Sequence, residues 1–333
     1  MDASQTESPS VSLIEDLDLW GLKCALLTTV LDLELFDAIA AGRHTVEAIA
    51  DLTRCSQRGI RILLDALCPL GLLKKTGGQY HLAATSQAFL TRTGPAYCAQ
   101  AYLTWWRIRE KMAEAVRTGS PVLDLTVPAA GGFWASYAAS DLVMWAEIAG
   151  QAREGWRMMG VSRETFPEAQ VLDVACGSGA KSYSLLQDDP EARVTAVDSP
   201  EVLAIAARVA EEMDVAQQVT FRPGDIQTME FPQAAFDLVR FGAVLYFFNS
   251  DQVVSLLARA RRTLKSGGIV VISTLQADER RCEAETPLLN ALDFFVASPY
   301  GEVYTFGEYR SLLETAGFAA VTRHSEYLIS ARR

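Results

Sequence analysis

The apolar positions in the second half of the chain fall in short continuous runs that alternate with stretches of helical spacing. The runs predict strands at 170–174, 193–197, 218–222, 236–241, 268–274, 319–323 and 326–331. The stretches between them predict helices at 179–187, 201–213, 251–264 and 308–316. Strands that alternate with helices are typical of an open parallel sheet covered by helices, so this half of the chain is expected to form an α/β domain.

The first part of the chain has a different pattern. Apolar residues recur at helical spacing from Val11 to about Ala41. They are more numerous than a surface helix needs, so part of this segment is expected to meet another subunit. The elements predicted after it are helices at 45–52 and 57–70 and short strands at 72–75 and 80–82. His44 or Thr45 is expected to cap the first of these helices.

Two helices followed by a hairpin indicate a winged helix, for which two functions are open. A DNA-binding regulator needs a cationic reading helix for its phosphate contacts. The second helix carries Arg58 and Arg61 but also Asp65, and the whole chain has a formal net charge of −11. That balance disfavours a nucleic-acid or anionic-membrane surface, so we expect an assembly module.

Residues 97–166 are helical by pattern and rich in aromatic residues. Two stretches, 119–121 and 128–132, interrupt the helices with glycine and proline. Most of the rings are expected to pack in a core. The aromatic residues of this segment are Tyr97, Tyr102, Trp105, Trp106, Phe133, Trp134, Tyr137, Trp145 and Trp156.

The composition adds bounds to this picture. A length of 333 residues suggests two domains, and 50% hydrophobic with 21% charged residues is typical of a globular protein. The six cysteines form no C-x-x-C pair and no signal peptide is recognisable, so reduced thiols in the cytoplasm are expected. Residues 17–39 carry too many charges to cross a bilayer. Three histidines are too few for a His-rich metal site. Residues 1–10 are expected to be a disordered tail.

The strand at 170–174 leads into a turn of small residues, Ala175-Cys176-Gly177-Ser178-Gly179, and then into a helix. Glycines let the backbone approach a ligand, and the helix start favours an anionic group. The dinucleotide fingerprint G-x-G-x-x-G fails because its third glycine falls on Ser182. The next strand ends in Asp198, which suits a bidentate contact to two ribose hydroxyls; the alternative is a helix cap from Asp198 or Ser199.

The run Asp173-Val174-Ala175-Cys176-Gly177-Ser178-Gly179 resembles motif I of the S-adenosylmethionine-dependent methyltransferases. The segments 31–37, 45–52, 63–67 and 71–73 resemble the N-terminal dimerisation domain of the small-molecule O-methyltransferases, which include plant caffeate-type and bacterial antibiotic-tailoring enzymes. The resemblance covers nearly the whole chain and implies a homodimer. It also implies a winged-helix dimerisation domain at 11–96, a helical linker and substrate lid at 97–166, and a seven-stranded Rossmann-like methyltransferase domain at 167–333 that ends in an antiparallel hairpin.

The resemblance implies roles for residues near the strand ends. Asp173 would support the glycine turn from inside through hydrogen bonds to its backbone N–H groups, and the turn would hold the methionine end of S-adenosylmethionine. Asp198 would bind the ribose, while Asp225 and Ile226 would bind the adenine. The expected cofactor-binding residues are Asp173, Ala175, Gly177, Gly179, Asp198, Ser199, Asp225, Ile226, Phe241 and Gly242. The expected substrate-binding residues are Tyr102, Trp105, Trp106, Trp134, Phe247 and Phe294.

In the family, a His-Asp-Trp motif follows the fourth strand. This chain departs from the family there, because Tyr246, Phe247 and Phe248 occupy those positions. A tyrosine with a pKa of about 10 is a poor base but orients a hydroxyl or donates to a carbonyl. Asp293 matches a substrate-contacting segment, where it is either a buried base with a raised pKa or a helix-surface acid.

The function that these features predict is methyl transfer to an O, C or N atom of a small, aromatic or polycyclic natural product. Tyr246 and Asp293 are the candidate catalytic residues. A family member that binds S-adenosylmethionine but catalyses a cyclisation or decarboxylation is the alternative, and a DNA-binding regulator is a less favoured one. No metal is expected.

Overall fold

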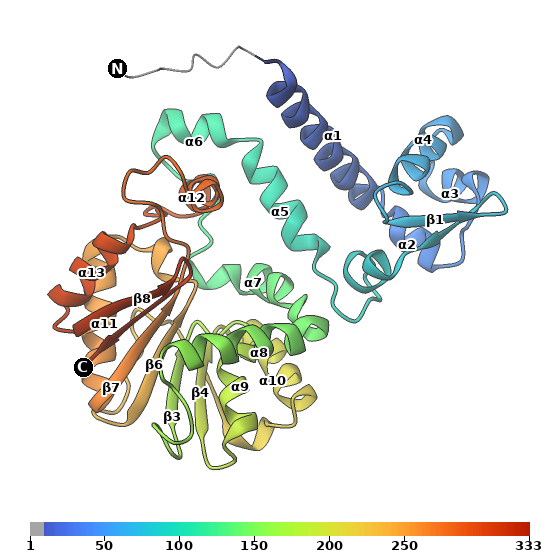
Figure 1. The fold of residues 1–333 in the computed structure, drawn as a ribbon. Helices are drawn as coiled ribbons and strands as arrows, with labels where there is room; N and C mark the ends of the chain where they lie inside the picture. Colours follow the sequence, from blue (N-terminus) through green and yellow to red (C-terminus); the bar gives the residue numbers. More distant parts are fainter. Residues whose placement is uncertain (1–9) are drawn as a thin grey trace, which may run out of the picture. The chain divides into compact units, whose positions relative to one another are not determined.

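The computed structural model describes residues 10–333. The chain forms two compact units that meet between Ala99 and Gln100 (Figure 1). Of the tail predicted at 1–10, all but Ser10 lies outside the described residues. Within residues 10–333, none of the helices combines the length and the apolar character that crossing a bilayer requires.

The first unit begins with two helices, α1 at Ser12–Asp32 and α2 at Leu35–Ala40, so the segment of helical spacing from 11 to about 41 is divided once. Glu34 breaks it with a left-handed backbone, φ 53°. A left-handed residue other than glycine costs roughly 1–2 kcal/mol. The break places Leu35 and Phe36 in the core, where they are at most 1% exposed. Burial of each such side chain contributes about 1.5–3 kcal/mol, which outweighs the strain.

The winged-helix elements follow in the predicted order. They are α3 at Val46–Thr53, α4 at Gln57–Leu67, β1 at Leu73–Thr76, β2 at Gln79–Leu82 and a single π-helical turn, η1, at Ser86–Leu90. Thr45 caps α3 by accepting a hydrogen bond from the Ala48 N–H at 3.2 Å. The helix α4 ends at Leu67 instead of reaching residue 70, because Pro69 has no backbone N–H with which to continue the helical hydrogen bonds.

The second unit is built on a seven-stranded sheet with the strand order β5-β4-β3-β6-β7-β9-β8. The first five strands of that order are parallel, and β9 runs antiparallel to both β7 and β8. The strands are β3 at Gln170–Val174, β4 at Arg193–Asp198, β5 at Val219–Pro223, β6 at Phe236–Gly242, β7 at Leu264–Ser273, β8 at Ala319–Ser325 and β9 at Leu328–Arg332. All seven predicted strands, and the expected fold class, are confirmed.

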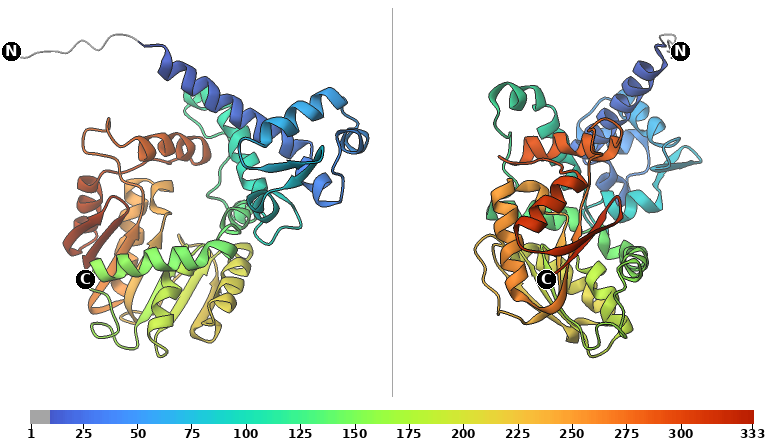
Figure 2. Two further views of the ribbon diagram at one scale, coloured as in Figure 1. Left: turned by 45° about the vertical axis from the view of Figure 1, so that its right-hand side comes forward. Right: turned by 60° about the vertical axis from the view of Figure 1, so that its left-hand side comes forward.

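Helices cover both faces of this sheet (Figures 1 and 2). One face carries α8 at Asp141–Met158, α9 at Ala180–Asp188 and α10 at Pro200–Glu212, and the other carries α11 at Ser250–Thr263 and α13 at Phe306–Thr315. The remaining helices are α5 at Ala99–Arg109, α6 at Met112–Thr118, η2 at Pro128–Ala130, α7 at Gly131–Ala138, η3 at Ala216–Gln218, η4 at Leu245–Phe247 and α12 at Glu285–Ala297. A capping box of Asn249 and Gln252 opens α11.

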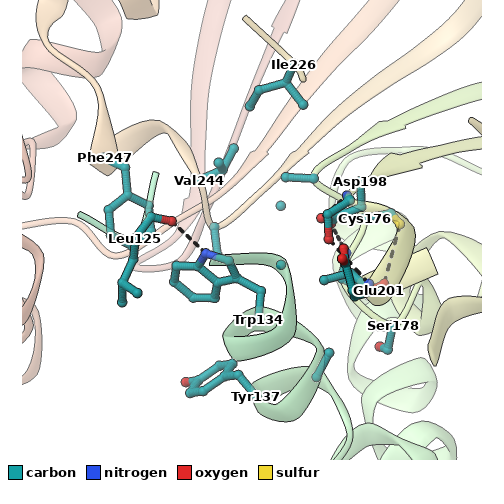
Figure 3. A pocket seen from close by; sticks show the side chains of 18 of the residues that line it. Leu125, Trp134, Tyr137, Cys176, Ser178, Asp198, Glu201, Ile226, Val244 and Phe247 are labelled. Atoms are coloured by element: carbon teal, nitrogen blue, oxygen red, sulfur yellow. Dashed lines mark hydrogen bonds between the residues drawn. The ribbon is translucent and has the colours of Figure 1, made fainter. Parts of the chain in front are cut away.

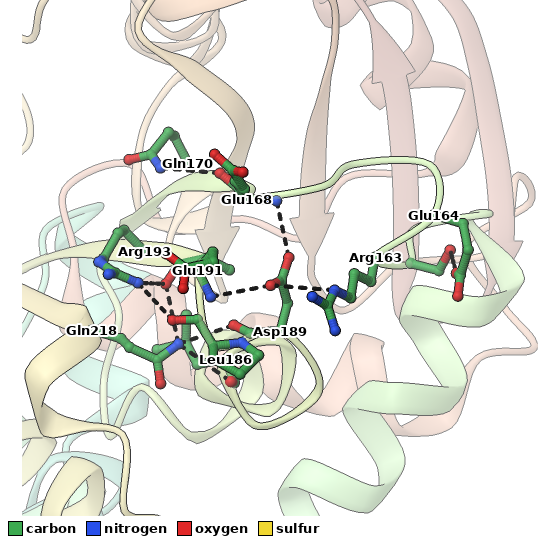
Figure 4. Close-up of polar contacts among 12 residues, drawn as sticks. Arg163, Glu164, Glu168, Gln170, Leu186, Asp189, Glu191, Arg193 and Gln218 are labelled. Carbon is green, nitrogen blue, oxygen red and sulfur yellow. Dashed lines mark hydrogen bonds and ion pairs between the residues drawn. The ribbon is translucent and has the colours of Figure 1, made fainter.

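The amino end of the sheet is held by a polar network around Asp189 (Figure 4). Its carboxylate accepts hydrogen bonds from the backbone N–H groups of Glu168, at 2.9 Å, and Glu191, at 3.1 Å. Arg163 forms an ion pair with the same carboxylate. These contacts connect the segments that enter β3 and β4 and leave the carboxyl ends of the strands for a site.

Candidate functional site

A cavity of about 990 Å³ opens at the carboxyl ends of β3, β4, β5 and β6 in the second unit. The glycine turn and the ends of these strands form one side of it. Residues between Leu125 and Asp141 form the other. Its volume is in the range of small-molecule sites.

The glycine turn forms the floor of this cavity. Ala175 and Gly177 line it with left-handed backbone, φ 54° and 58°. No atom lies within 4 Å of where a Gly177 Cβ would be, so the backbone there faces open space. Gly179 does not line the cavity: a side chain at this position would overlap the ring of Tyr183. The glycine is thus required by the packing of Tyr183, and its expected cofactor contact stays a prediction.

Asp173 does not support the turn in the predicted way. It is fully buried, and its carboxylate accepts hydrogen bonds from Ser182 Oγ at 2.6 Å and Arg240 Nη1 at 2.7 Å. The Gly177 N–H binds Asp198 instead, at 3.0 Å. The side chain of Asp173 lies on the α9 side of the sheet, where these two partners are, and it does not line the cavity. Burial raises the pKa of Asp173, and Arg240 opposes the rise.

Asp198 stands at the wall of the cavity (Figure 3). Besides the contact to Gly177, its Oδ1 accepts from the Ser199 N–H at 2.8 Å. Burial raises the pKa of Asp198 to about 6. The cap of α10 is the Ser199 hydroxyl, which accepts from Val202, so capping does not account for Asp198. The carboxylate therefore remains available beside the turn.

Further along the edge, Asp225 and Ile226 line the cavity after β5, as does Gly242 at the end of β6. A Cβ on Gly242 would lie 2.7 Å from the Ala175 carbonyl oxygen, so only glycine fits between the two strands. Phe241 is 2% exposed and belongs to the core. Its side chain does not line the cavity, since strand alternation turns it away, and the structure gives no support for its expected contact with the cofactor.

The other end of the cavity is lined by aromatic side chains. Trp134 donates its indole N–H to the Leu125 carbonyl oxygen at 2.8 Å and packs edge-on against Phe247 at 5.4 Å (Figure 3). Tyr102 and Tyr137 line the same end. Of the predicted substrate-binding residues, Tyr102, Trp134 and Phe247 therefore face the cavity.

Trp105, Trp106 and Phe294 do not line the cavity. Trp105 is buried in a separate cluster, edge-on to Phe133. Phe294 stacks on the ring of Tyr246, with centroids 3.9 Å apart, and so supports the wall from behind. The sequence pattern predicted that these residues lie on helices, but it did not predict which face of each helix meets the cavity.

The two candidate catalytic residues have different surroundings. Tyr246 lines the cavity, and burial raises the pKa of its phenol, so the hydroxyl stays protonated near neutrality. Asp293 does not line it. Its carboxylate accepts from Arg109 Nε at 2.7 Å and from a second nitrogen of the same guanidinium. This bidentate pair corrects the expectation of an acid in the acceptor pocket.

Several residues that line the cavity were not predicted. Asp141 of α8 accepts from Ser178 Oγ at 2.6 Å, and burial raises its pKa. Lys181, in the first turn of α9, extends into the cavity, where the surrounding protein and Arg240 lower the pKa of its amine to about 8. Nothing in the sequence pointed to Asp141 as a site residue, because it lies far from the glycine turn along the chain. Lys181 follows the turn by two residues, and that position was the available clue.

The folds and sequences of known proteins match this arrangement. An O-methyltransferase domain model matches residues 161–319, and an O-methyltransferase dimerisation domain model matches residues 21–92. The tetracenomycin polyketide synthesis 8-O-methyl transferase of Streptomyces glaucescens is 28% identical, over 89% of this chain and 87% of its own length. The 3-hydroxy-5-methyl-1-naphthoate 3-O-methyltransferase of Streptomyces sahachiroi is 26% identical, over 93% and 90%.

A solved structure shares the fold. Human N-acetylserotonin methyltransferase in complex with S-adenosylmethionine superposes with a TM-score of 0.73 at 24% identity, covering 100% of this chain and 99% of its own. A largely parallel sheet with a glycine turn after one strand and an acid at the end of the next is typical of a Rossmann-like nucleotide site. The chain belongs to the O-methyltransferase family. It is an S-adenosylmethionine-dependent methyltransferase, as the resemblance implied.

Proposed function

We propose that S-adenosylmethionine binds along the strand-end side of the 990 Å³ cavity. Asp198 binds the ribose hydroxyls, Asp225 and Ile226 receive the adenine, and Ala175 and Gly177 lie against the methionine end. The observation that carries this proposal is the Asp198 carboxylate, which is fixed by the Gly177 N–H at 3.0 Å and lines the cavity. The open space at Gly177 and the restriction to glycine at residue 242 fit a ligand that lies close to the backbone.

The bound sulfonium supplies a methyl group that is already activated. The protein has to align the acceptor atom and exclude water, and such positioning accounts for about 7–11 kcal/mol of a barrier. Trp134 and Phe247 provide the flat apolar surface, and Tyr246 offers a hydroxyl donor at the same wall. Because the phenol stays protonated, we assign it to orienting the acceptor and not to removing its proton.

The acceptor that fits this end of the cavity is a small aromatic or polycyclic natural product. Aromatic side chains that meet edge-on, as Trp134 and Phe247 do, favour flat rings between or beside them. Two relatives of this chain are named for a polyketide and a naphthoate, which supports the same class. A hydroxyl is the acceptor group we favour, since the family is one of O-methyltransferases.

A homodimer is the assembly that the first unit supports. The dimerisation domain model includes most of α1. Along that helix, Leu13, Leu17, Trp20 and Leu22 are each more than 60% exposed. A partner chain would remove this apolar surface from water.

The six unpaired cysteines fit the reducing cytoplasm.

The cofactor site is tested by calorimetric titration of S-adenosylmethionine into Asp198→Ala. Two hydrogen bonds to a carboxylate are lost, each worth roughly 1.5–3 kcal/mol, so the affinity should fall by about a hundredfold or more. Asp251→Asn, which removes an exposed carboxylate from the first turn of α11, is the control. Unchanged binding by a folded Asp198→Ala protein would move the ribose contact elsewhere.

A further inference from the structure

A second cavity of about 400 Å³ lies between α8 and the ends of β6 and β7, beside the turn that joins β8 to β9. It shares a wall with the first cavity. Five residues line both: Gln151, Lys181, Arg240, Ala243 and Tyr246. A ligand that passes this wall therefore reaches from one cavity into the other.

The charge of the second cavity is one-sided. Among the described residues that line it, Lys181 and Arg240 are charged and no carboxylate is present. Arg240 is balanced by Asp173 at 2.7 Å. For Lys181, no carboxylate among residues 10–333 is within ion-pair distance, and its side chain is exposed to the cavities. A cation in this position favours an anionic ligand.

The rest of the wall is both polar and apolar. Hydroxyls come from Ser273 and Tyr246, and apolar surface from Trp156, Met159 and Leu328. The indole of Trp156 is held in place, since its N–H donates to Ser184 Oγ at 3.1 Å. Such a wall suits a flat apolar body that carries a carboxylate, and the volume is within the range of small-molecule sites.

We propose that the second cavity binds the carboxylate-bearing end of an aromatic acceptor, with Lys181 as the partner of the carboxylate. Tyr246 then lies where the acceptor passes toward the cofactor. The proposal rests on the proposed function for the placement of the reacting end, whereas the carboxylate subsite rests on the residues that line the second cavity. It assigns Lys181 as a residue that selects acidic acceptors over neutral ones.

The probe is 1-naphthoate, a flat ring system with one carboxylate, and its neutral counterpart is 1-naphthamide. Calorimetry is carried out on the full-length protein saturated with S-adenosylhomocysteine. The wild type should bind naphthoate at least tenfold more tightly than naphthamide. Lys181→Met should lose at least tenfold in naphthoate affinity and leave naphthamide unchanged, while Lys181→Arg should keep most of it. Lys111→Met, an exposed lysine next to α6, is the matched control.

Three results would overturn the proposal. Equal naphthoate affinity in Lys181→Met and wild type would show that the lysine does not pair with the carboxylate. Naphthoate binding that occurs in the cofactor-free protein and is lost on saturation with S-adenosylhomocysteine would assign Lys181 to the carboxylate of the cofactor. Weaker S-adenosylhomocysteine binding by Lys181→Met would assign it in the same way. Undiminished naphthoate binding by Leu275→Trp, which fills the second cavity alone, would place the probe elsewhere. Failure of the wild type to bind S-adenosylhomocysteine would instead count against the proposed function.

Discussion

At the residue scale, the chemistry of the acceptor depends on Tyr246. Its ring is fixed between Phe247, edge-on at 4.9 Å, and Phe294, stacked at 3.9 Å. The pKa of the phenol is raised by burial, so the group donates a hydrogen bond and does not accept a proton near neutrality. Since Asp293 is held by Arg109, the cavity has no unpaired acid from α12 to act as a base. An acceptor with an acidic hydroxyl, such as a phenol, suits this arrangement.

Tyr246→Phe should therefore lower turnover while the ring packing persists. Loss of one orienting hydrogen bond costs about 1–3 kcal/mol of transition-state stabilisation, which is roughly tenfold to a hundredfold in rate. The measurement is kcat with a hydroxylated aromatic acceptor, and turnover is monitored through the release of S-adenosylhomocysteine. S-adenosylmethionine affinity serves as the control and should stay constant. Wild-type turnover in this variant would leave the hydroxyl without a role in methyl transfer.

At the scale of elements, the two ends of the parallel strands have separate tasks. The carboxyl ends carry the glycine turn and the acids, with left-handed backbone at Ala175 and Gly177. The amino ends carry the Asp189 network, which satisfies the backbone N–H groups of Glu168 and Glu191 (Figure 4). The carboxyl ends thus carry the residues of the site, and a firmly hydrogen-bonded edge lies opposite.

Asp189→Ala should destabilise the second unit without changing the site. It removes two hydrogen bonds from backbone N–H groups to a carboxylate, and a hydrogen bond to a charged group is worth roughly 1.5–3 kcal/mol. The midpoint of urea unfolding should fall accordingly. Asp188→Ala is the matched control, because its carboxylate is 60% exposed and pairs only with Arg153 at the surface, at 3.4 Å. Equal unfolding midpoints for the two variants would contradict the role assigned to Asp189.

At the scale of the whole molecule, assembly should depend on α1. The helix exposes Leu17 and Trp20 by 63% and 62% of their surfaces. We expect sedimentation velocity to report a dimer at micromolar concentration. The double change Leu17→Glu and Trp20→Glu should yield monomers, because two charges would have to be buried at the interface. Asp16→Asn on the same helix should leave the dimer intact. A wild-type monomer would refute this assignment of the exposed surface.

The sequence by itself determined where the strands and the residues of the candidate site lie along the second unit. Short apolar runs between helical stretches predicted all seven strands. For the buried parallel strands β3 and β6 the physical reason is that both faces of the strand are covered and must be apolar. The glycine turn and the position of Asp198 followed from the same local pattern, whereas Asp225 followed from the resemblance to the family. The cap at Thr45 and the capping box at Asn249 are local too, since each joins residues three apart.

Only the tertiary structure decided which partner each side chain meets. Asp173 finds Arg240, which lies 67 residues later, and Asp293 finds Arg109, which lies 184 residues earlier. Helical spacing could not tell that Trp105 faces a separate core while Trp134 faces the cavity. Lys181 is a candidate carboxylate-binding residue only because α8, β6 and β7 enclose a cavity that it lines. Burial and charge pairing arise when distant segments pack together, and for that reason they are absent from any local pattern.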